Sequence, residues 1–187
     1  QFWDGRSPDL IDQAKGPLQA HFEMNITPKE LEMKINAIKG YKKLFAKAYG
    51  KEKKITFELI AETIAIFEST LVTPSRYDAF LLGDDKALSD TEKEGLELFI
   101  SKRCVSCHQG VALGGLMRYF VKEKFSYGNV GGFSGNQNKL VKVPTLRNIT
   151  QTAPYFHNGT VWNLKDTILE MGRIQLKLSI TDDEAQK

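Results

Sequence analysis

Apolar residues recur every three or four positions through the first part of the chain, which is the spacing of one helix face. Thr27–Glu30 forms a capping box with proline at the first helical position, so one helix should begin there and continue to Gly50. A second should begin near Thr56 and end before Pro74. Their apolar positions are Leu31, Ile35, Ile38, Tyr41, Leu44, Phe45 and Ala48, and then Ile60, Ile64, Phe67 and Leu71. We interpret both stripes as core packing.

The following region predicts a linker and a second group of helices. The stretch 74–86 is interpreted as a linker into a second unit. Ser89–Glu92 is another capping box and predicts a helix carrying Leu96 and Phe99. Seven glycines between residues 109 and 138 predict loops that approach a flat cofactor closely. No periodicity indicates a sheet of any size. The expected fold class is therefore all-α, with few or no strands.

Composition places the chain among ordinary globular proteins. Its 187 residues suit one large or two small domains, and 41% are hydrophobic and 26% charged. The net charge of +3, from 26 basic and 23 acidic residues, indicates no nucleic-acid partner. No apolar run reaches membrane-spanning length, so no membrane association is expected. The chain begins with Gln1, which suggests a processed or trimmed protein.

The helix predicted after residue 89 leads into CVSCH at Cys104–His108, which contains the only two cysteines of the chain. CxxCH is typical of covalent c-type haem attachment, in which both thiols bond the porphyrin and the imidazole ligates iron. A redox disulfide would need a βαβ context that is not visible. A zinc site would need two further ligands, and His21 and His157 lie far off in sequence. We predict haem c, and therefore export to the periplasm.

The haem iron needs a second axial ligand, for which the sequence offers three candidates. Met117 follows His108 by only nine residues, and His157 lies in a polar, turn-rich stretch. Met171 lies on a helix predicted from Asn163, 63 residues after His108, which is ample separation to cross the distal face. We select Met171, which predicts a six-coordinate haem of relatively high potential that transfers electrons.

Several segments resemble, in colinear order, the bacterial di-haem cytochrome c peroxidases, and the related enzymes that mature methylamine dehydrogenase share much of this pattern. The segments are Phe2–Arg6, Gln13–Ala14, Gly16–Pro17, Phe22–Met24, Val143–Asn148, Thr152–Val161, and Met171–Gly172 with Gln175. The resemblance implies two cytochrome c-like helical domains packed around covalently bound haem. Residues 1–82 would be the rear part of the N-terminal peroxidatic domain, and 83–187 the C-terminal electron-transfer domain.

The resemblance also implies the haem of the second domain. Cys104 and Cys107 would hold the electron-entry haem, with His108 and Met171 on its iron. Trp3 matches a tryptophan between the two haems, which would act as an electron relay. The maturation enzymes carry tyrosine at the position of Met171, so this methionine favours the peroxidase.

Further matched positions imply a peroxide pocket and a calcium site. Glu23 matches the distal acid–base residue, and Gln13 a glutamine near the same pocket. A carboxylate in an apolar haem pocket has a raised pKa, which suits it to move a proton between the peroxide oxygens. Thr152 and Pro154 match positions whose carbonyls bind an interdomain calcium.

The chain departs from the family pattern at both ends. The family's other CxxCH lies upstream of Phe2, and this chain begins after it and stops short of the closing helix. We expect one haem on this chain and a second on an N-terminal part that is missing here. The implied function is a periplasmic, dimeric peroxidase that takes electrons from a small cytochrome c, with loops near 110–135 moving as a redox gate. The alternatives are a mono-haem electron carrier and a di-haem protein-maturation oxidase.

Overall fold

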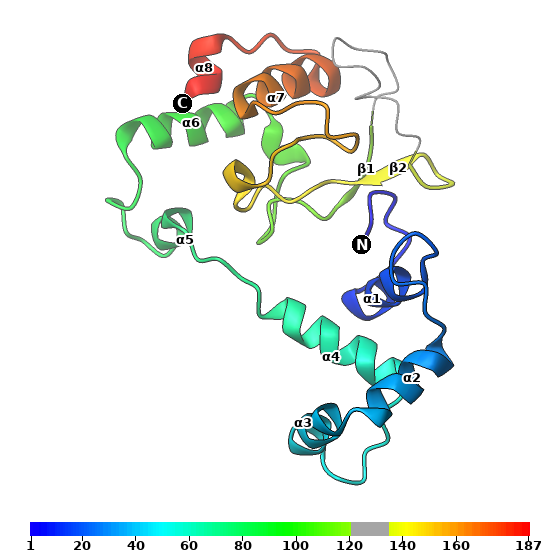
Figure 1. The fold of residues 1–187 in the computed structure, drawn as a ribbon. Helices are drawn as coiled ribbons and strands as arrows, with labels where there is room; N and C mark the ends of the chain where they lie inside the picture. Colours follow the sequence, from blue (N-terminus) through cyan, green and yellow to red (C-terminus); the bar gives the residue numbers. More distant parts are fainter. Residues whose placement is uncertain (121–134) are drawn as a thin grey trace. The chain divides into compact units, whose positions relative to one another are not determined.

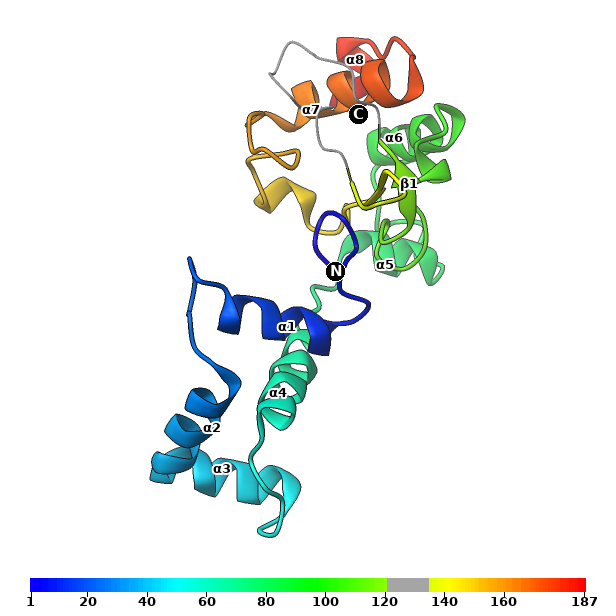
Figure 2. The same cartoon turned by 90° about the vertical axis from the view of Figure 1, so that its right-hand side faces the viewer.

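A computed structural model describes residues 1–120 and 135–187 and divides the chain into two compact units. The first unit holds Gln1 and Ser7–Val72, and the second holds Phe2–Arg6 and Thr73–Lys187. Helices dominate both units, and the only strands in the described ranges are two of three residues each (Figure 1, Figure 2). This confirms the predicted all-α fold class. Within the same ranges, no helix has the length and apolarity that crossing a bilayer requires.

The first unit contains four helices around one apolar cluster. They are α1 (Leu10–Gln19), α2 (Pro28–Ala37), α3 (Lys39–Tyr49) and α4 (Phe57–Ser69). The capping box predicted at Thr27 is present, with the Thr27 N–H donating to the Glu30 carboxylate over 2.9 Å. Helix α1 packs against α4, and the core consists of Leu18, Leu31, Ile55, Phe57 and Ile60. The predicted stripes therefore supply core residues only in part. Five of their positions are exposed, namely Ile38, Tyr41, Leu44, Phe67 and Leu71.

The single helix expected from Pro28 to Gly50 is wrong, because the chain breaks at Ile38. Ile38 has an extended backbone, with φ −85° and ψ 110°, and separates α2 from α3. A straight helix over this range would carry its far end about 33 Å from its start, at 1.5 Å per residue. The break allows Phe45 of α3 to pack on the same small cluster as Leu31 of α2. Burial of both side chains thus overrides the continuous helical pattern.

The second unit combines short helices with a two-stranded antiparallel sheet. Its elements are α5 (Arg76–Leu81), α6 (Asp90–Ser101), the 3-10 turn η1 (Cys104–Ser106), β1 (Met117–Tyr119), β2 (Leu140–Lys142), the 3-10 turn η2 (Ile149–Gln151), α7 (Leu164–Met171), the π-helical turn η3 (Gly172–Leu176) and α8 (Asp182–Gln186). Met117 lies opposite Lys142 in the sheet. Tyr155, Val161 and Ile174 form the buried core. This unit contains the CVSCH motif.

The stretch 74–86, expected to be a linker, contains helix α5. Its start carries a capping box, in which the Ser75 N–H donates to the Asp78 carboxylate over 2.8 Å. The pattern Ser-x-x-Asp was available in the sequence but is followed by only six helical residues. Along the chain, the boundary between the two compact units lies between Val72 and Thr73, and α5 belongs to the second unit. The division into family domains at 82/83 stays a prediction.

The glycine-rich stretch 109–138 is described only in part. Residues 121–134, which include Gly128, Gly131 and Gly132, lie outside the described residues. At Gly114, a Cβ atom would collide with the backbone carbonyl of Pro144. The absence of a side chain at Gly114 thus allows the backbone of this loop to lie directly against the backbone at Pro144.

Candidate functional site

The CVSCH motif forms one tight turn after α6. Arg103 adopts a left-handed conformation, with φ +66°, and turns the chain from α6 into η1. The His108 N–H donates to the Cys104 carbonyl over 3.0 Å, which closes the turn. Cys104 and Cys107 are half-buried free thiols. Two thiols and an imidazole on a single turn are the arrangement that covalent haem attachment requires.

The imidazole of His108 is oriented by a backbone carbonyl. Its Nδ1 lies 3.3 Å from the Leu113 oxygen, five residues along the chain. Burial lowers the pKa of His108, while the carbonyls of Leu113 and Pro144 act in the opposite direction. The ring is therefore held preferentially neutral, which is the form that ligates iron. Burial also raises the pKa of the Cys104 thiol.

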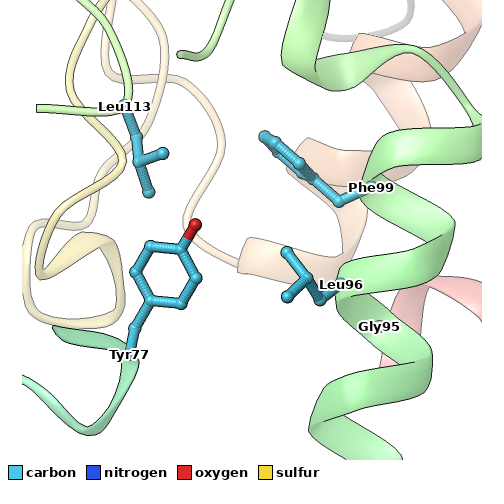
Figure 3. A pocket seen from close by; sticks show the side chains of 5 residues that line it. All are labelled: Tyr77, Gly95, Leu96, Phe99 and Leu113. Carbon is cyan, nitrogen blue, oxygen red and sulfur yellow. The ribbon is translucent and has the colours of Figure 1, made fainter. Parts of the chain in front are cut away.

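An apolar cavity of about 240 Å³ adjoins this turn. Its lining comes from three segments, with Tyr77 on α5, Leu96 and Phe99 on α6, and Leu113 in the loop after the histidine. Figure 3 shows these four side chains directed into a common space. Gly95 completes the lining and leaves its part of the α6 surface without a side chain. The pocket is connected to His108 through Leu113, whose carbonyl bonds the imidazole.

The loop that carries Leu113 is covered by the segment Val143–Arg147. The Gly115 N–H donates to the Val143 carbonyl over 2.7 Å, and Gly114 lies directly against Pro144. In the sequence, this segment stands out only as part of a family motif, with no predicted role. The role depends on contacts between residues about 30 positions apart, for which the sequence carries no local signal.

The three candidates for the second axial ligand lie in different surroundings. The thioether of Met117 packs against Gly5, where a Cβ atom would come within 2.6 Å of its sulfur. The ring of His157 packs edge-on against Trp3, with centroids 6.3 Å apart. Met171 is half-buried at the end of α7, where the helix changes into the π-helical turn η3.

Trp3 belongs to the second unit. The Lys142 N–H donates to the Trp3 carbonyl over 2.8 Å, which fixes the N-terminal segment along the end of β2. The indole is 40% exposed and contacts the ring of His157, whose pKa is lowered by burial. The structure therefore brings Trp3 and His157 together, a pairing that the sequence did not reveal.

Glu23 and Gln13 belong to the first unit. Gln13 is half-buried on α1, and Glu23 lies on an exposed turn directly after this helix. Backbone hydrogen bonds hold the turn against α1, with the Met24 N–H donating to Pro17 over 3.2 Å and the Ile26 N–H donating to Leu18 over 3.0 Å. The turn therefore has a fixed backbone that presents Glu23 outward.

The positions matched to a calcium site lie at the surface of the second unit. Thr152 ends the turn η2, where its N–H and hydroxyl both donate to the Ile149 carbonyl over 3.2 Å. Pro154 follows it and is also exposed. Among the described residues, no three side chains of the types His, Cys, Asp and Glu gather around a common point.

Comparison with known proteins assigns this arrangement to a family. Residues 1–86 match the family model of the di-haem cytochrome c peroxidases. The whole chain is 41% identical to cytochrome c551 peroxidase of Pseudomonas aeruginosa and covers 58% of that protein. Over 89% of its length it is 30% identical to the methylamine utilization protein MauG of Methylophilus methylotrophus, of which it covers 52%. The chain thus spans little more than half the length of these relatives.

A solved structure supports the fold assignment. A MauG-like protein associated with microbial copper homeostasis superposes with a TM-score of 0.73, over 98% of this chain and 69% of that one, at 22% identity. The matches in sequence and fold agree with the resemblance found in the motifs. The match of residues 1–86 to the di-haem cytochrome c peroxidase family model and the similarity of the whole chain to cytochrome c551 peroxidase thus lead to the same family.

Proposed function

We propose that this chain is part of a periplasmic di-haem peroxidase that reduces hydrogen peroxide to water. The overall reaction consumes one peroxide, two protons and two electrons, and it releases two molecules of water. The electrons would come one at a time from a small cytochrome c and enter through the haem at Cys104–His108. A homodimer is the assembly that we expect from the family resemblance.

The observation that carries this proposal is the match to cytochrome c551 peroxidase along the entire chain. A mono-haem electron carrier would need only the second unit, yet the match includes the first unit with Gln13 and Glu23. A protein-maturation oxidase is disfavoured by Met171, because the maturation enzymes carry tyrosine at that position. The peroxidase therefore accounts for more of the chain than either alternative.

The residues of the second unit fit a haem c. Cys104 and Cys107 would hold it through thioethers, and the neutral imidazole of His108 would be one axial ligand. Met171 is proposed as the other, because Met117 packs against Gly5 and His157 against Trp3. When bound, the haem supplies one-electron redox chemistry, at a potential that methionine ligation raises.

Trp3 is proposed as the relay between this haem and a second haem attached outside the chain. Its indole is held in place by the backbone hydrogen bond from Lys142 and by the edge-on contact with His157. A fixed aromatic ring between two redox centres offers a defined path for an electron. Packing at a domain interface is compatible with this role.

Glu23 is proposed as the acid–base residue of peroxide reduction, and Gln13 as a polar neighbour in the same pocket. Glu23 stands between Phe22 and Met24, which are 96% and 64% exposed in this chain. When a haem domain covers this turn, the apolar neighbours would shield the Glu23 carboxylate from bulk water. The ionised carboxylate would take the proton from the inner peroxide oxygen and deliver it to the outer one, which eases cleavage of the O–O bond and leaves the carboxylate ionised again.

The carbonyls of Thr152 and Pro154 are proposed as ligands of a calcium ion between the two domains. Carbonyl oxygens are suitable ligands for this hard cation. Loops near 110–135 are proposed to move when the redox state of the second-domain haem changes, although residues 121–134 lie outside the described part of the chain. Such movement would open the peroxide site only after the first electron arrives.

The test is a haem count on the intact, natively exported protein together with spectra recorded after half-reduction. We expect two haems per full-length chain by pyridine haemochrome, and a spectrum that becomes sensitive to azide and peroxide. A single haem that remains low-spin throughout would instead identify an electron carrier and would contradict the proposal.

A further inference from the structure

The loop between His108 and Gly114 has two backbone hydrogen bonds of its own, from the Leu113 N–H to the Gly110 carbonyl over 3.0 Å and from the Gly114 N–H to the Gln109 carbonyl over 3.1 Å. Its Val111 side chain is 89% exposed, so burial of this side chain does not fix the loop. Leu113 adopts a left-handed conformation, with φ +48°, which is strained for a residue with a branched side chain. The Leu113 carbonyl nevertheless has to stay in place, because it accepts the hydrogen bond from His108 Nδ1. These two backbone bonds use the carbonyls of Gln109 and Gly110, so the carbonyls of residues 111–113 are left to partners from side chains.

Two side chains from the segment Val143–Arg147 hold successive carbonyls of this loop. The Thr145 hydroxyl donates to the Ala112 oxygen over 2.5 Å, and Arg147 Nε donates to the Val111 oxygen over 2.8 Å. The Arg147 N–H also donates to the Thr145 hydroxyl over 3.1 Å, which links the two donors. The carbonyls of residues 111, 112 and 113 thus all accept hydrogen bonds from side chains.

The other end of the Arg147 guanidinium is anchored on α5. Its Nη1 lies 2.7 Å from Asp78 Oδ1 and 3.4 Å from the Ser75 hydroxyl, and the group lies 5.4 Å from the centroid of the Tyr77 ring. Hydrogen bonds from Ser75, with Arg147 beside them, lower the pKa of Asp78 and keep it ionised. Because the guanidinium is planar, its Nε and Nη1 donate in fixed directions to the loop and to α5 at once, whereas the donors of a lysine all lie on one nitrogen.

We propose that Arg147 and Thr145 are positioning residues for the axial ligand His108, and that they tune the potential of the haem through the Leu113 carbonyl. The inference rests on the proposed function only in requiring the haem at Cys104–His108. A hydrogen bond from the outer ring nitrogen of a ligating histidine fixes the ring and makes it a stronger electron donor to the metal. Displacing the loop weakens that bond, which favours ferrous iron and raises the potential.

The test uses the haem-loaded, full-length protein with Arg147→Lys, Thr145→Val and Thr145→Ser. Arg76→Lys is the matched control, because Arg76 also lies on α5 and pairs with the Glu92 carboxylate but has no bond to the loop. For each variant we would measure haem content, the midpoint potential of the His108 haem and its ferric low-spin EPR g values.

We expect Arg147→Lys and Thr145→Val to raise the midpoint potential and shift the g values. At a fixed solution potential, the ferric-to-ferrous ratio should fall about two- to tenfold. This change is smaller than the one expected from removing a group that is hydrogen-bonded directly to a metal ligand. Thr145→Ser, which keeps the hydroxyl, and Arg76→Lys should match the wild type. If Arg147→Lys does not fold, the comparison of Thr145→Val with Thr145→Ser still tests the proposal.

Unchanged potentials and g values in loaded Arg147→Lys and Thr145→Val would overturn the proposal. A wild type that carries this haem but lacks peroxide turnover would refute the proposed peroxidase and leave the comparison of potentials valid. A wild type without haem would refute both.

Discussion

In the first unit, buried apolar side chains from three helices and the segment before α4 meet in one cluster. Most of this unit consists of regular helices. In the second unit, turns and loops carry most of the proposed site residues, and polar contacts join positions far apart in the chain. Arg147 bonds Val111 across 36 positions, and Gln175 Nε2 donates to the Tyr119 carbonyl across 56 positions. A haem-binding region needs this second kind of support, because a large part of its natural core is the cofactor itself.

The two units also differ in what they leave exposed. Phe22 and Met24 of the first unit lie on the turn beside Glu23, where they contribute nothing to the core of this unit. The second unit instead contains an open apolar pocket lined by residues of α5, α6 and the loop after the histidine. The comparison predicts that variants of the second unit change haem chemistry, whereas variants of the first unit change folding or peroxide turnover.

The largest expected effect is loss of the haem itself. Replacement of both Cys104 and Cys107 by serine should abolish covalent attachment, because no other thioether can form in the chain. Haem staining after denaturing electrophoresis would show this. Ser106→Ala, in the same turn, is the control and should keep the stain. Haem that stays covalently bound without the two thiols would contradict the assignment of the site.

Met171→His should leave the haem attached but lower its midpoint potential. Methionine favours ferrous iron relative to histidine, so the shift should be on the order of 100 mV or more. Redox titration of the loaded protein measures it, and Met117→Leu is the control. If Met117→Leu produced the large shift and Met171→His did not, the proposed axial ligand would be wrong.

Ile60→Ala tests the apolar cluster of the first unit. Ile60 is 7% exposed, and removing its buried methyl and methylene groups should reduce the free energy of unfolding by about 2–5 kcal/mol. Ile66→Ala on the same helix is the control, because Ile66 is half exposed and should cost less than about 0.5 kcal/mol. Urea unfolding followed by circular dichroism distinguishes them. Equal losses would mean that the cluster is not the main support of this unit.

Glu23→Gln should reduce peroxide turnover of the complete protein by about 100-fold, the scale of general acid–base catalysis. Haem content and the midpoint potential of the His108 haem should stay unchanged, because Glu23 belongs to the first unit and is not among the residues proposed to hold that haem. Glu52→Gln, another exposed acid of this unit, should retain full activity. Normal turnover in Glu23→Gln would remove this carboxylate from the mechanism.

The smallest expected effect concerns Glu92 on the surface of the second unit. Hydrogen bonds from Arg76 and from the Ser89 backbone lower its pKa from 4.5 to about 2. Because the folded-state pKa is depressed, the stabilisation is complete above pH 4.5 and is lost as the pH falls towards 2. Glu92→Gln should therefore be less stable than the wild type at pH 7, and the difference should vanish near pH 2. Urea midpoints at both pH values test this, and a difference independent of pH would contradict it.

Local signals predicted the elements whose ends are marked in the sequence. The capping boxes at Thr27 and Ser89 are present, and Asn163 caps α7 as expected. The break at Ile38 was not predictable, because the helical spacing continues across it and only burial of Phe45 on the common cluster requires the turn. Helix α5 was missed because its six residues provide too little periodicity to outweigh the turn-forming residues around it.

The sequence by itself predicted the cofactor chemistry, since two thiols and an imidazole within five residues can reach one porphyrin edge whatever the rest of the chain does. It also indicated the family, through motifs in a fixed order. Only the tertiary structure decided how His108 is oriented, which side chains hold its loop, and that Trp3 meets His157. These contacts join residues that are far apart in the chain, and a hydrogen bond depends on positions in space that no local pattern of residues records.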